Sequence, residues 1–308
     1  MKAGQSEIKK FHLNPAFYSF HKEGKGANDF GLDNSGELIG NGFGLYSTAN
    51  LKKVRLGPMK TEFFRIALIR SGNVNLDIGL ETYFPICDSI VFGFPGQLFS
   101  LYDQSDDFFA YYMLFTEEFI SGSILLKNIK EQFPFLNYSG IQSFQLAHEE
   151  ACEIEDFIFR VNDEIKNRKE DIVQVIQLYI QLILLHANRT YIKQSAKEEV
   201  PTGMNALFRQ FIKLVNQHFL SMRKVSDYAE LLHVSSDHLN RVIKFHSHKT
   251  AHELIDEMIL TEAKAYLLHT GLSVAEIAYK LEFSDPSHFN KFFKKLTDST
   301  PLQYRGTK

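Results

Sequence analysis

Two stretches of the C-terminal third share one pattern, VSDYAELLHVS at residues 225–235 and VAEIAYKLEFS at residues 274–284. Each is followed after a few residues by a second matching segment, HLNRVIK at 238–244 and HFNKFFK at 288–294. Each copy indicates a short helix with a small Ala, a polar turn ending in Ser, and a second helix with an apolar seam and a partly basic face. This repetition predicts two tandem helix-turn-helix units, an arrangement typical of proteins that bind double-stranded DNA.

The second helix of each unit carries the candidate DNA contacts. Apolar side chains fall on one helical face, and polar or basic side chains fall on the opposite face at i, i+3, i+4 and i+7 spacing. In a major groove, Arg suits guanine, Asn suits adenine, and Lys suits phosphate or guanine. A solvated polar face is the alternative for any one residue, but the match between the copies favours DNA. The candidate DNA-binding residues are Ser236, Asp237, His238, Asn240, Arg241, Lys244, Asp285, Ser287, His288, Asn290, Lys291, Lys294 and Lys295.

Helix ends are signalled clearly in this region. Ser273 and Glu276 have the spacing of a capping box, and Asp285 before Pro286 predicts the N-cap of the second recognition helix. Residues 251–269 carry a long apolar pattern that predicts a linker helix between the units. Such a helix would hold the two recognition helices at a fixed separation, and about 34 Å would place both in the major groove on one face of DNA.

The N-terminal half has a different pattern, with β-branched and aromatic runs separated by Gly, Asn and Pro from about residue 17 to 115. This pattern predicts an antiparallel β-barrel or sandwich. Its aromatic side chains either line a site for a small organic effector or simply fill the interior. The strands expected most clearly are Glu62–Ile69, Val74–Ile78, Ser89–Phe92 and Phe108–Phe115.

Helical periodicity begins at His148, and two helices over residues 148–168 and 171–193 are expected to form an antiparallel hairpin. The apolar stripe of the second helix, which includes Ile176, Ile180 and Leu184, is either core or part of a dimer interface. The polar, Pro-containing residues that follow, 194–203, have the composition of a linker.

Composition limits the class of protein. The chain has 308 residues and a net charge of −3, but residues 201–308 carry an excess of Lys and Arg over Asp and Glu. The sign of this asymmetry suits a DNA-facing C-terminal half. Two distant cysteines, no signal-peptide pattern and no uninterrupted apolar span favour a cytoplasmic protein without a membrane partner.

These residues resemble the AraC/XylS family of bacterial transcription regulators. The resemblance covers roughly residue 204 to the end and is carried by TGLSVAEIA at 270–278, FSDPSHFNKFFKK at 283–295 and TPLQYR at 300–305. It implies two helix-turn-helix units that each place one helix in the major groove. More weakly, it implies an N-terminal cupin-like barrel followed by dimerising helices. Glu282 and Asp298 stand where the family usually has Gly, so some strain is expected at Glu282.

The expected fold is therefore α+β. A cupin-like antiparallel sensory barrel spans residues 1–147, and a helical hairpin, the dimerisation element, spans 148–193. A linker spans 194–203, and a DNA-binding domain of two helix-turn-helix motifs joined by a linker helix spans 204–308. The expected partners are double-stranded DNA, a second copy of the chain, a small-molecule effector, and RNA polymerase if the protein is an activator.

Two classes of enzyme fit the sequence less well. A metal-dependent cupin enzyme needs clustered histidines, and no histidine occurs between His21 and His148. An alkylation-repair enzyme needs an activated cysteine, whereas Cys87 and Cys152 have no supporting cluster and are expected to be buried thiols. His246, His248 and His252 lack carboxylate or thiolate partners and are expected on the surface or at a helix cap. No enzyme activity, catalytic residue, metal site or cofactor is predicted, and a purely architectural DNA-binding protein stays an alternative.

Overall fold

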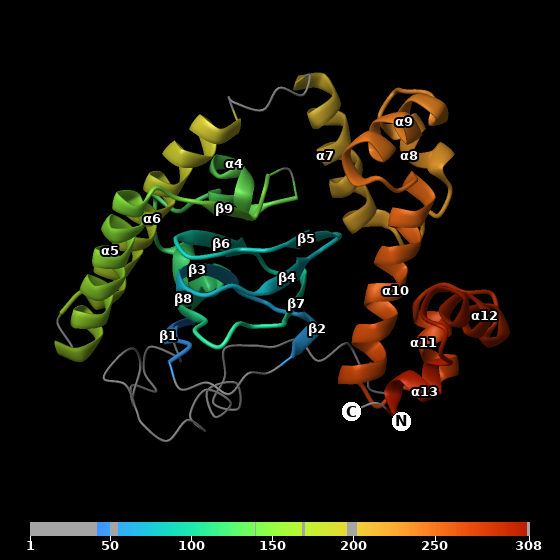
Figure 1. The fold of residues 1–308 in the computed structure, drawn as a ribbon, viewed down its shortest axis with the longest axis horizontal. Helices are drawn as coiled ribbons and strands as arrows, with labels where there is room; N and C mark the ends of the chain where they lie inside the picture. Colours follow the sequence, from blue (N-terminus) through green and yellow to red (C-terminus); the bar gives the residue numbers. More distant parts are fainter. Residues whose placement is uncertain (1–41, 50–54, 139, 168–169, 196–201, 307–308) are drawn as a thin grey trace.

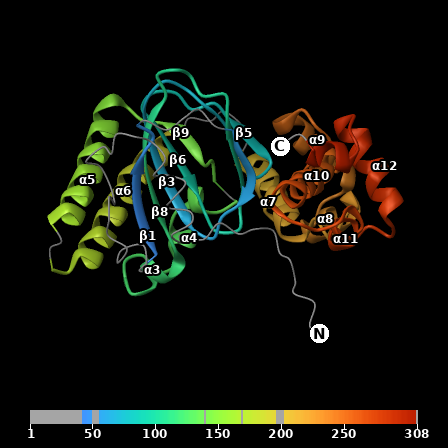
Figure 2. The ribbon, with the colours of Figure 1, turned by 90° about the horizontal axis from the view of Figure 1, so that it is seen from below.

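The structure is a computed structural model that describes residues 42–49, 55–138, 140–167, 170–195 and 202–306. Two antiparallel sheets occupy the middle of the molecule (Figure 1). A helical hairpin covers one side of them, and the C-terminal helices lie on the opposite side, an arrangement that both views show (Figures 1 and 2). The β-rich half and the helical half agree with the predicted α+β class.

The first sheet, sheet I, has the strand order β1-β8-β3-β6-β9, and the second, sheet II, has the order β2-β7-β4-β5. All of their strand pairs are antiparallel. The two sheets and their connections are called the two-sheet domain below. The strands are β1 (Phe43–Ser47), β2 (Leu56–Lys60), β3 (Phe64–Ser71), β4 (Asn75–Ile78), β5 (Glu81–Tyr83), β6 (Ser89–Gly93), β7 (Leu98–Tyr102), β8 (Phe109–Phe115) and β9 (Ser143–Gln145).

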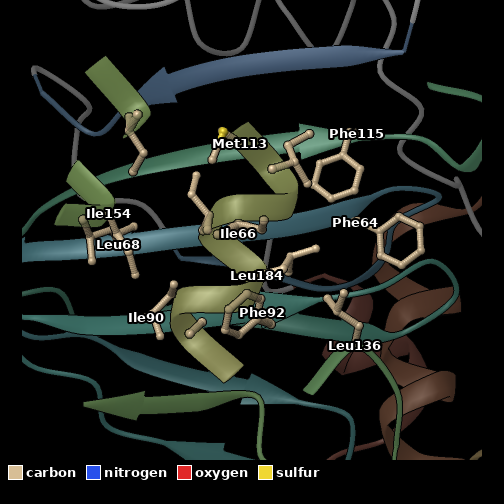
Figure 3. Close-up of a cluster of buried hydrophobic side chains, with 14 of the residues drawn as sticks. Phe64, Ile66, Leu68, Ile90, Phe92, Met113, Phe115, Leu136, Ile154 and Leu184 are labelled. Atoms are coloured by element: carbon tan, nitrogen blue, oxygen red, sulfur yellow. The ribbon is translucent and has the colours of Figure 1, made fainter. Parts of the chain in front are cut away.

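Successive side chains of β3, the central strand of sheet I, point to opposite faces, as strand geometry requires. Phe64, Ile66 and Leu68 are buried on the face that the helical hairpin covers (Figure 3). Figure 3 shows Leu184 and Ile154 of the hairpin among these side chains. The main core therefore lies between sheet I and the helices, while the opposite face of β3 looks toward sheet II.

The hairpin consists of α5 (His148–Asn167) and α6 (Ile172–Ser195). The stripe expected from the sequence, with Ile176, Ile180 and Leu184, is fully buried against sheet I and belongs to the core. Exposed apolar side chains on α6 come from other positions. Before the hairpin lie short helices that the sequence analysis did not predict, α3 (Glu117–Ser121), α4 (Ile129–Gln132) and the 3-10 turn η1 (Pro134–Leu136).

The C-terminal half is helical. Of the expected linker, residues 196–201 lie outside the described residues, α6 continues to Ser195, and α7 begins at Thr202. No helix in the described ranges is long and apolar enough to cross a membrane. The helices are α7 (Thr202–His218), α8 (Val225–Leu231), α9 (Ser236–Ser247), α10 (Ala251–His269), α11 (Val274–Lys280), α12 (Pro286–Thr297) and α13 (Pro301–Arg305).

Candidate nucleic-acid interface

Two helix-turn-helix units form as the repetition predicts. The first unit consists of α8 and α9, the second consists of α11 and α12, and α10 is the continuous helix that joins them (Figure 1). Each unit buries the apolar face of its second helix, which includes Leu239 and Val242 in α9 and Phe289 and Phe293 in α12. The opposite, polar faces of α9 and α12 are therefore the ones left for a partner.

Side-chain caps fix where each recognition helix begins. The hydroxyl of Ser235 accepts a hydrogen bond from the backbone N–H of His238 at the start of α9. At the start of α12, the carboxylate of Asp285 accepts from the N–H groups of Ser287 and His288. The hydrogen bond from the His288 N–H lowers the pKa of Asp285 below its ordinary value. Asp285 thus has the capping role that the sequence indicates.

The turns of the two units contain a residue in the left-handed region at matching positions. His233 has φ 54° in the first turn, and Glu282 has φ 57° in the second. In each turn the next residue closes a hydrogen bond to the small Ala of the preceding helix, from Val234 N–H to Ala229 O and from Phe283 N–H to Ala278 O. A side chain at positive φ is strained, so the strain expected at Glu282 has a counterpart at His233.

On the exposed face of α9, the basic side chains of Arg241 and Lys244 lie one turn apart, after Asp237. The Arg241 guanidinium lies 2.8 Å from the His238 ring nitrogen Nδ1, which orients it along the helix surface. Ser236 is half-buried at the first helical position.

The side chain of Asn240 forms a hydrogen bond within the protein. Its side-chain oxygen accepts a hydrogen bond from the Ala251 N–H at 3.1 Å and so helps to cap the first turn of α10. This bond uses one of the two lone pairs of the oxygen that a bidentate pair with adenine also needs, and it holds the side chain toward α10. Among the candidate contacts of α9, Asn240 is therefore a positioning residue in this arrangement, and the charges of Arg241 and Lys244 are left to face a partner.

On α12, Ser287, Lys291, Lys294 and Lys295 are exposed. Asn290 is half-buried and donates from Nδ2 to the Pro286 carbonyl, which leaves its side-chain oxygen outside that bond. The His288 ring lies 2.8 Å from the Ser284 hydroxyl and 3.3 Å from the Asp285 carboxylate. The outer face of α12 is consequently the more basic of the two.

A long-range contact holds the two units together. Arg223, between α7 and α8, donates a hydrogen bond to the Leu281 carbonyl and stacks on the Phe283 ring, 4.4 Å from its centroid. Arg305 of α13 donates to the Leu267 and Leu272 carbonyls, at 3.2 and 2.6 Å, and so fixes the turn between α10 and α11. Neither arginine could be predicted, because the backbone carbonyls that they bind carry no signal in the sequence.

The C-terminal helices also contact the two-sheet domain. Lys60 Nζ of β2 lies 2.7 Å from Glu262 Oε1 of α10, and the Glu262 side chain is almost completely buried. The other oxygen, Glu262 Oε2, is buried without a hydrogen-bond partner. Leu98 of β7 enters the hydrophobic core of the first unit. The position of the linker helix is therefore connected to that of the sheets.

The cysteines and histidines singled out in the sequence have other placements. Cys87 is exposed, so the expectation that it is buried was wrong; it lies in the turn before β6, and its thiol is 3.1 Å from the Arg70 carbonyl. Cys152 is half-buried. His248 ends α9 with φ 56°, and His246 stacks on Phe208. Within the described ranges, no group of three or more His, Cys, Asp or Glu side chains is placed to hold a metal ion.

Comparison with known proteins supports this picture of the C-terminal half. The helix-turn-helix domain family (HTH_18) matches residues 228–307. The HTH-type transcriptional activator RhaS of Salmonella schwarzengrund is 28% identical over 128 residues, which are 42% of this chain and 44% of the relative. The chain thus matches less than half of the length of this curated relative.

Solved structures overlap the chain only partly. The C-terminal domain of AraT, a response regulator from Geobacillus stearothermophilus, is 26% identical with a TM-score of 0.32, covering 36% of this chain and 89% of that one. Unsaturated fatty acid-bound ToxT from Vibrio cholerae is 16% identical with a TM-score of 0.41, covering 85% and 94%. The assignment therefore rests on the helix-turn-helix match and the RhaS relatives. Residues 228–307 are thus a helix-turn-helix domain of the AraC type, and the chain is similar there to the RhaS transcriptional activators.

Proposed function

We propose that the whole chain is a sequence-specific transcription regulator that inserts α9 and α12 into successive major grooves on one face of double-stranded DNA. The observation that supports this most is the pair of recognition helices with exposed basic faces, joined by the single helix α10. A helix fits the major groove, and two helices about one DNA turn apart reach the same face of the duplex.

The exposed side chains divide into two roles. Arg241 on α9 and Asn290 on α12 are proposed to contact bases, because a guanidinium recognises guanine and a carboxamide recognises adenine. Asn290 can contact adenine when the hydrogen bond from its side-chain amide to the Pro286 carbonyl is broken. Lysines carry charge without fork geometry and are proposed to bind phosphates, together with the N–H groups at the helix starts. The proposed phosphate contacts are Ser236, Lys244, Ser287, His288, Lys291, Lys294 and Lys295, with Asp237 and His238 beside them on α9.

The N-terminal two-sheet domain is proposed to bind a small organic effector that modulates DNA binding. The contact between β2 and α10, which includes Lys60 and Glu262, supports a connection between the two activities. In this proposal the protein works in the cytoplasm and contacts RNA polymerase where it activates. No catalytic step is proposed.

A second copy of the chain is the proposed partner of α6. Its outer side carries exposed Leu178, Leu182, Leu185 and Ile192. The spacing of four, three and seven residues keeps these side chains in one seam, as in helices that pair along a heptad stripe. An exposed apolar seam on a helix is typical of a protein interface, and a twofold axis lets the same seam pair with itself.

Dimerisation is tested by sedimentation of the full chain. The variant Leu182→Glu/Leu185→Glu is expected to sediment as a monomer under conditions where the original chain is a dimer. Leu302→Glu, on exposed α13, is the matched control and is expected to leave the dimer intact. A monomeric original chain at high concentration would remove this part of the proposal.

The central experiment mixes the full-length protein with sheared genomic DNA from its source and sequences what is bound. Two short boxes about one helical turn apart are expected in the enriched DNA. A Lys294→Ala/Lys295→Ala variant should bind all sequences more weakly with a flatter salt dependence, whereas Lys166→Ala on α5 should behave as the original. Enrichment of no common sequence, or a sequence-selective loss in the lysine variant, would contradict the proposed roles.

A further inference from the structure

The inner face of sheet I carries an arginine. Phe64, Ile66 and Leu68 of β3 face the helices (Figure 3). Because side chains alternate along a strand, Arg65 and Ala67 face sheet II. The register places Gly93 and Leu114 opposite Arg65 on the neighbouring strands. Arg65 thus stands on the central strand and points between the two sheets.

Part of the inner face of the two sheets is accessible. Ala67 lies in the middle of sheet I, with strands paired on both sides and sheet II in front, yet it is only half-buried. Its neighbours Val91 and Ala110 on this face are small and buried, whereas Leu101 and Tyr83 of sheet II are only half-buried. A filled interior would bury the side chain of Ala67 completely. The inner face of the sheets therefore borders an accessible hollow.

Arg65 borders this hollow without an anion beside it. Its guanidinium carbon lies 3.6 Å from the centroid of the Phe99 ring and 5.9 Å from that of Phe63. No carboxylate of the described residues forms an ion pair with it, and the titratable group that raises its pKa against the effect of burial is the phenol of Tyr112. The Arg65 side chain is only half-buried.

A second arginine of the same strand shows what a structural arginine looks like here. Arg70 forms ion pairs with Asp88 and with Glu155, which satisfy its guanidinium within the protein. Burial lowers the pKa of Arg65 to about 10. Burial also acts to lower the pKa of Arg70, but the carboxylates of Glu155 and Asp88 outweigh it and raise that pKa above its ordinary value. At neutral pH Arg65 stays charged, and its fork of N–H donors matches a carboxylate.

We propose that the hollow between the sheets binds a small monocarboxylate with an apolar body, and that Arg65 forms the ion pair with its carboxylate. This inference rests on the proposed function, in which the two-sheet domain holds an effector, and it specifies the chemical class of that effector. The rings of Phe99 and Tyr112 and the small side chains around Ala67 contact the apolar body. A single cation among apolar walls favours one negative charge over a phosphate or a dicarboxylate.

Calorimetric titration of the full-length protein, without DNA, tests the inference with matched pairs of probes, octanoate against octanamide and phenylacetate against phenylacetamide. At least one carboxylate is expected to bind, and its amide to bind at least about tenfold more weakly, because a charge-assisted bond is replaced by a neutral one. Arg65→Met is expected to abolish the preference for the carboxylate, and Arg65→Lys to retain part of it. Arg55→Met removes a guanidinium that stacks on Tyr102, and it should leave the preference unchanged.

A structural role for Arg65 predicts a different result. If the arginine serves only to stack on Phe99, Arg65→Met will lower the melting temperature and no carboxylate will be preferred over its amide. An arginine without a partner is instead expected to be replaceable by Met with an equal or higher melting temperature, whereas Arg70→Met should lower it. The inference is overturned if no carboxylate binds more tightly than its amide, or if Arg65→Met leaves that preference unchanged. If such a protein still selects a DNA sequence, the proposed DNA-binding function stands.

Discussion

The first and second helix-turn-helix units have the same backbone plan but different surroundings. Both turns use a non-glycine residue at positive φ, and both close on the carbonyl of a small Ala. The core of the first unit also includes Leu98 of the two-sheet domain, whereas the core around the second unit includes no residue of the sheets among those described. The comparison shows that two units of the same backbone structure can be fixed differently. The first unit packs against the two-sheet domain, and the second is held by α10, α13 and Arg223.

The two units also differ in how they use asparagine. Asn240 places its oxygen on the Ala251 N–H and so joins α9 to the linker helix, while Asn290 bonds within its own helix. Equivalent positions in the two copies therefore have different structural roles. The first unit is the better anchored of the two, and the second keeps more of its polar side chains available.

Leu98→Ala is expected to have the largest effect and to act unequally on the units. Truncating this buried leucine should cost about 3 kcal/mol, since it leaves a cavity in the core of the first unit. Hydrogen exchange measured by mass spectrometry should speed up in α8 and α9 more than in α11 and α12. Leu76→Ala, buried inside the two-sheet domain, is the control and should not favour one unit. Equal acceleration in both units by Leu98→Ala would refute the difference in attachment.

Removing one proposed base contact from each unit should affect DNA binding next most strongly. Arg241→Ala and Asn290→Ala are each expected to weaken binding to the selected DNA by about 1–3 kcal/mol. Each variant should relax the sequence preference in one of the two boxes only, because each unit reads its own part of the site. Binding selections repeated with both variants would show this. Wild-type affinity and preference in both variants would mean that the faces assigned to the groove are wrong.

Asn240→Ala is expected to act on stability by about 1 kcal/mol, because the Ala251 N–H loses its acceptor at the start of α10. The urea midpoint of the full chain measures this loss. Asn290→Ala is the matched control and should change the midpoint less, since it releases a carbonyl within an intact helix. If the two alanine variants shift the urea midpoint equally, Asn240 does not stabilise the fold more than Asn290 does.

Glycine at the positive-φ positions should stabilise each unit slightly. His233→Gly and Glu282→Gly remove a left-handed strain of about 1–2 kcal/mol and add roughly 0.5–1 kcal/mol of chain entropy to be lost on folding, so a small net gain is expected. Both variants should raise the melting temperature by similar amounts. A gain in only one of them would show that the two turns are not equivalent.

Acid should weaken the start of the second recognition helix and spare that of the first. The folded pKa of Asp285 is lowered by its bond from the His288 N–H, so its contribution is present above the unfolded pKa, about 4, and is lost as the pH falls through the folded value. The stability difference between the original chain and Asp285→Asn should therefore shrink between pH 5 and pH 3. Ser235→Asn, at the uncharged cap of α9, should give a difference that does not change with pH.

Local features were predictable from the sequence, because they depend on residues within a few positions of each other. The capping box of Ser273 and Glu276, the N-cap at Asp285 before Pro286 and the backbone strain at Glu282 all follow this rule. The helical hairpin and the strands were predictable from periodicity in the same way. Periodicity could not say which apolar positions of α6 are covered: Ile176 and Ile180 are buried, whereas Leu178 and Leu182 are exposed.

Tertiary structure alone decided what distant side chains do. Lys60 and Glu262 are 202 residues apart, and only the docking of β2 against α10 brings them to 2.7 Å. Asn240 has the sequence of a groove residue, but its side-chain oxygen accepts from the Ala251 N–H. Arg65 has the sequence of an ordinary strand residue, but it faces sheet II and forms no ion pair with any described residue. Helices, strands, caps and turns can be predicted from neighbouring residues, since these elements minimise free energy over a few positions. Which surfaces remain free for DNA, for a second copy or for a ligand depends on which faces the packed elements cover, and that is a property of the whole fold.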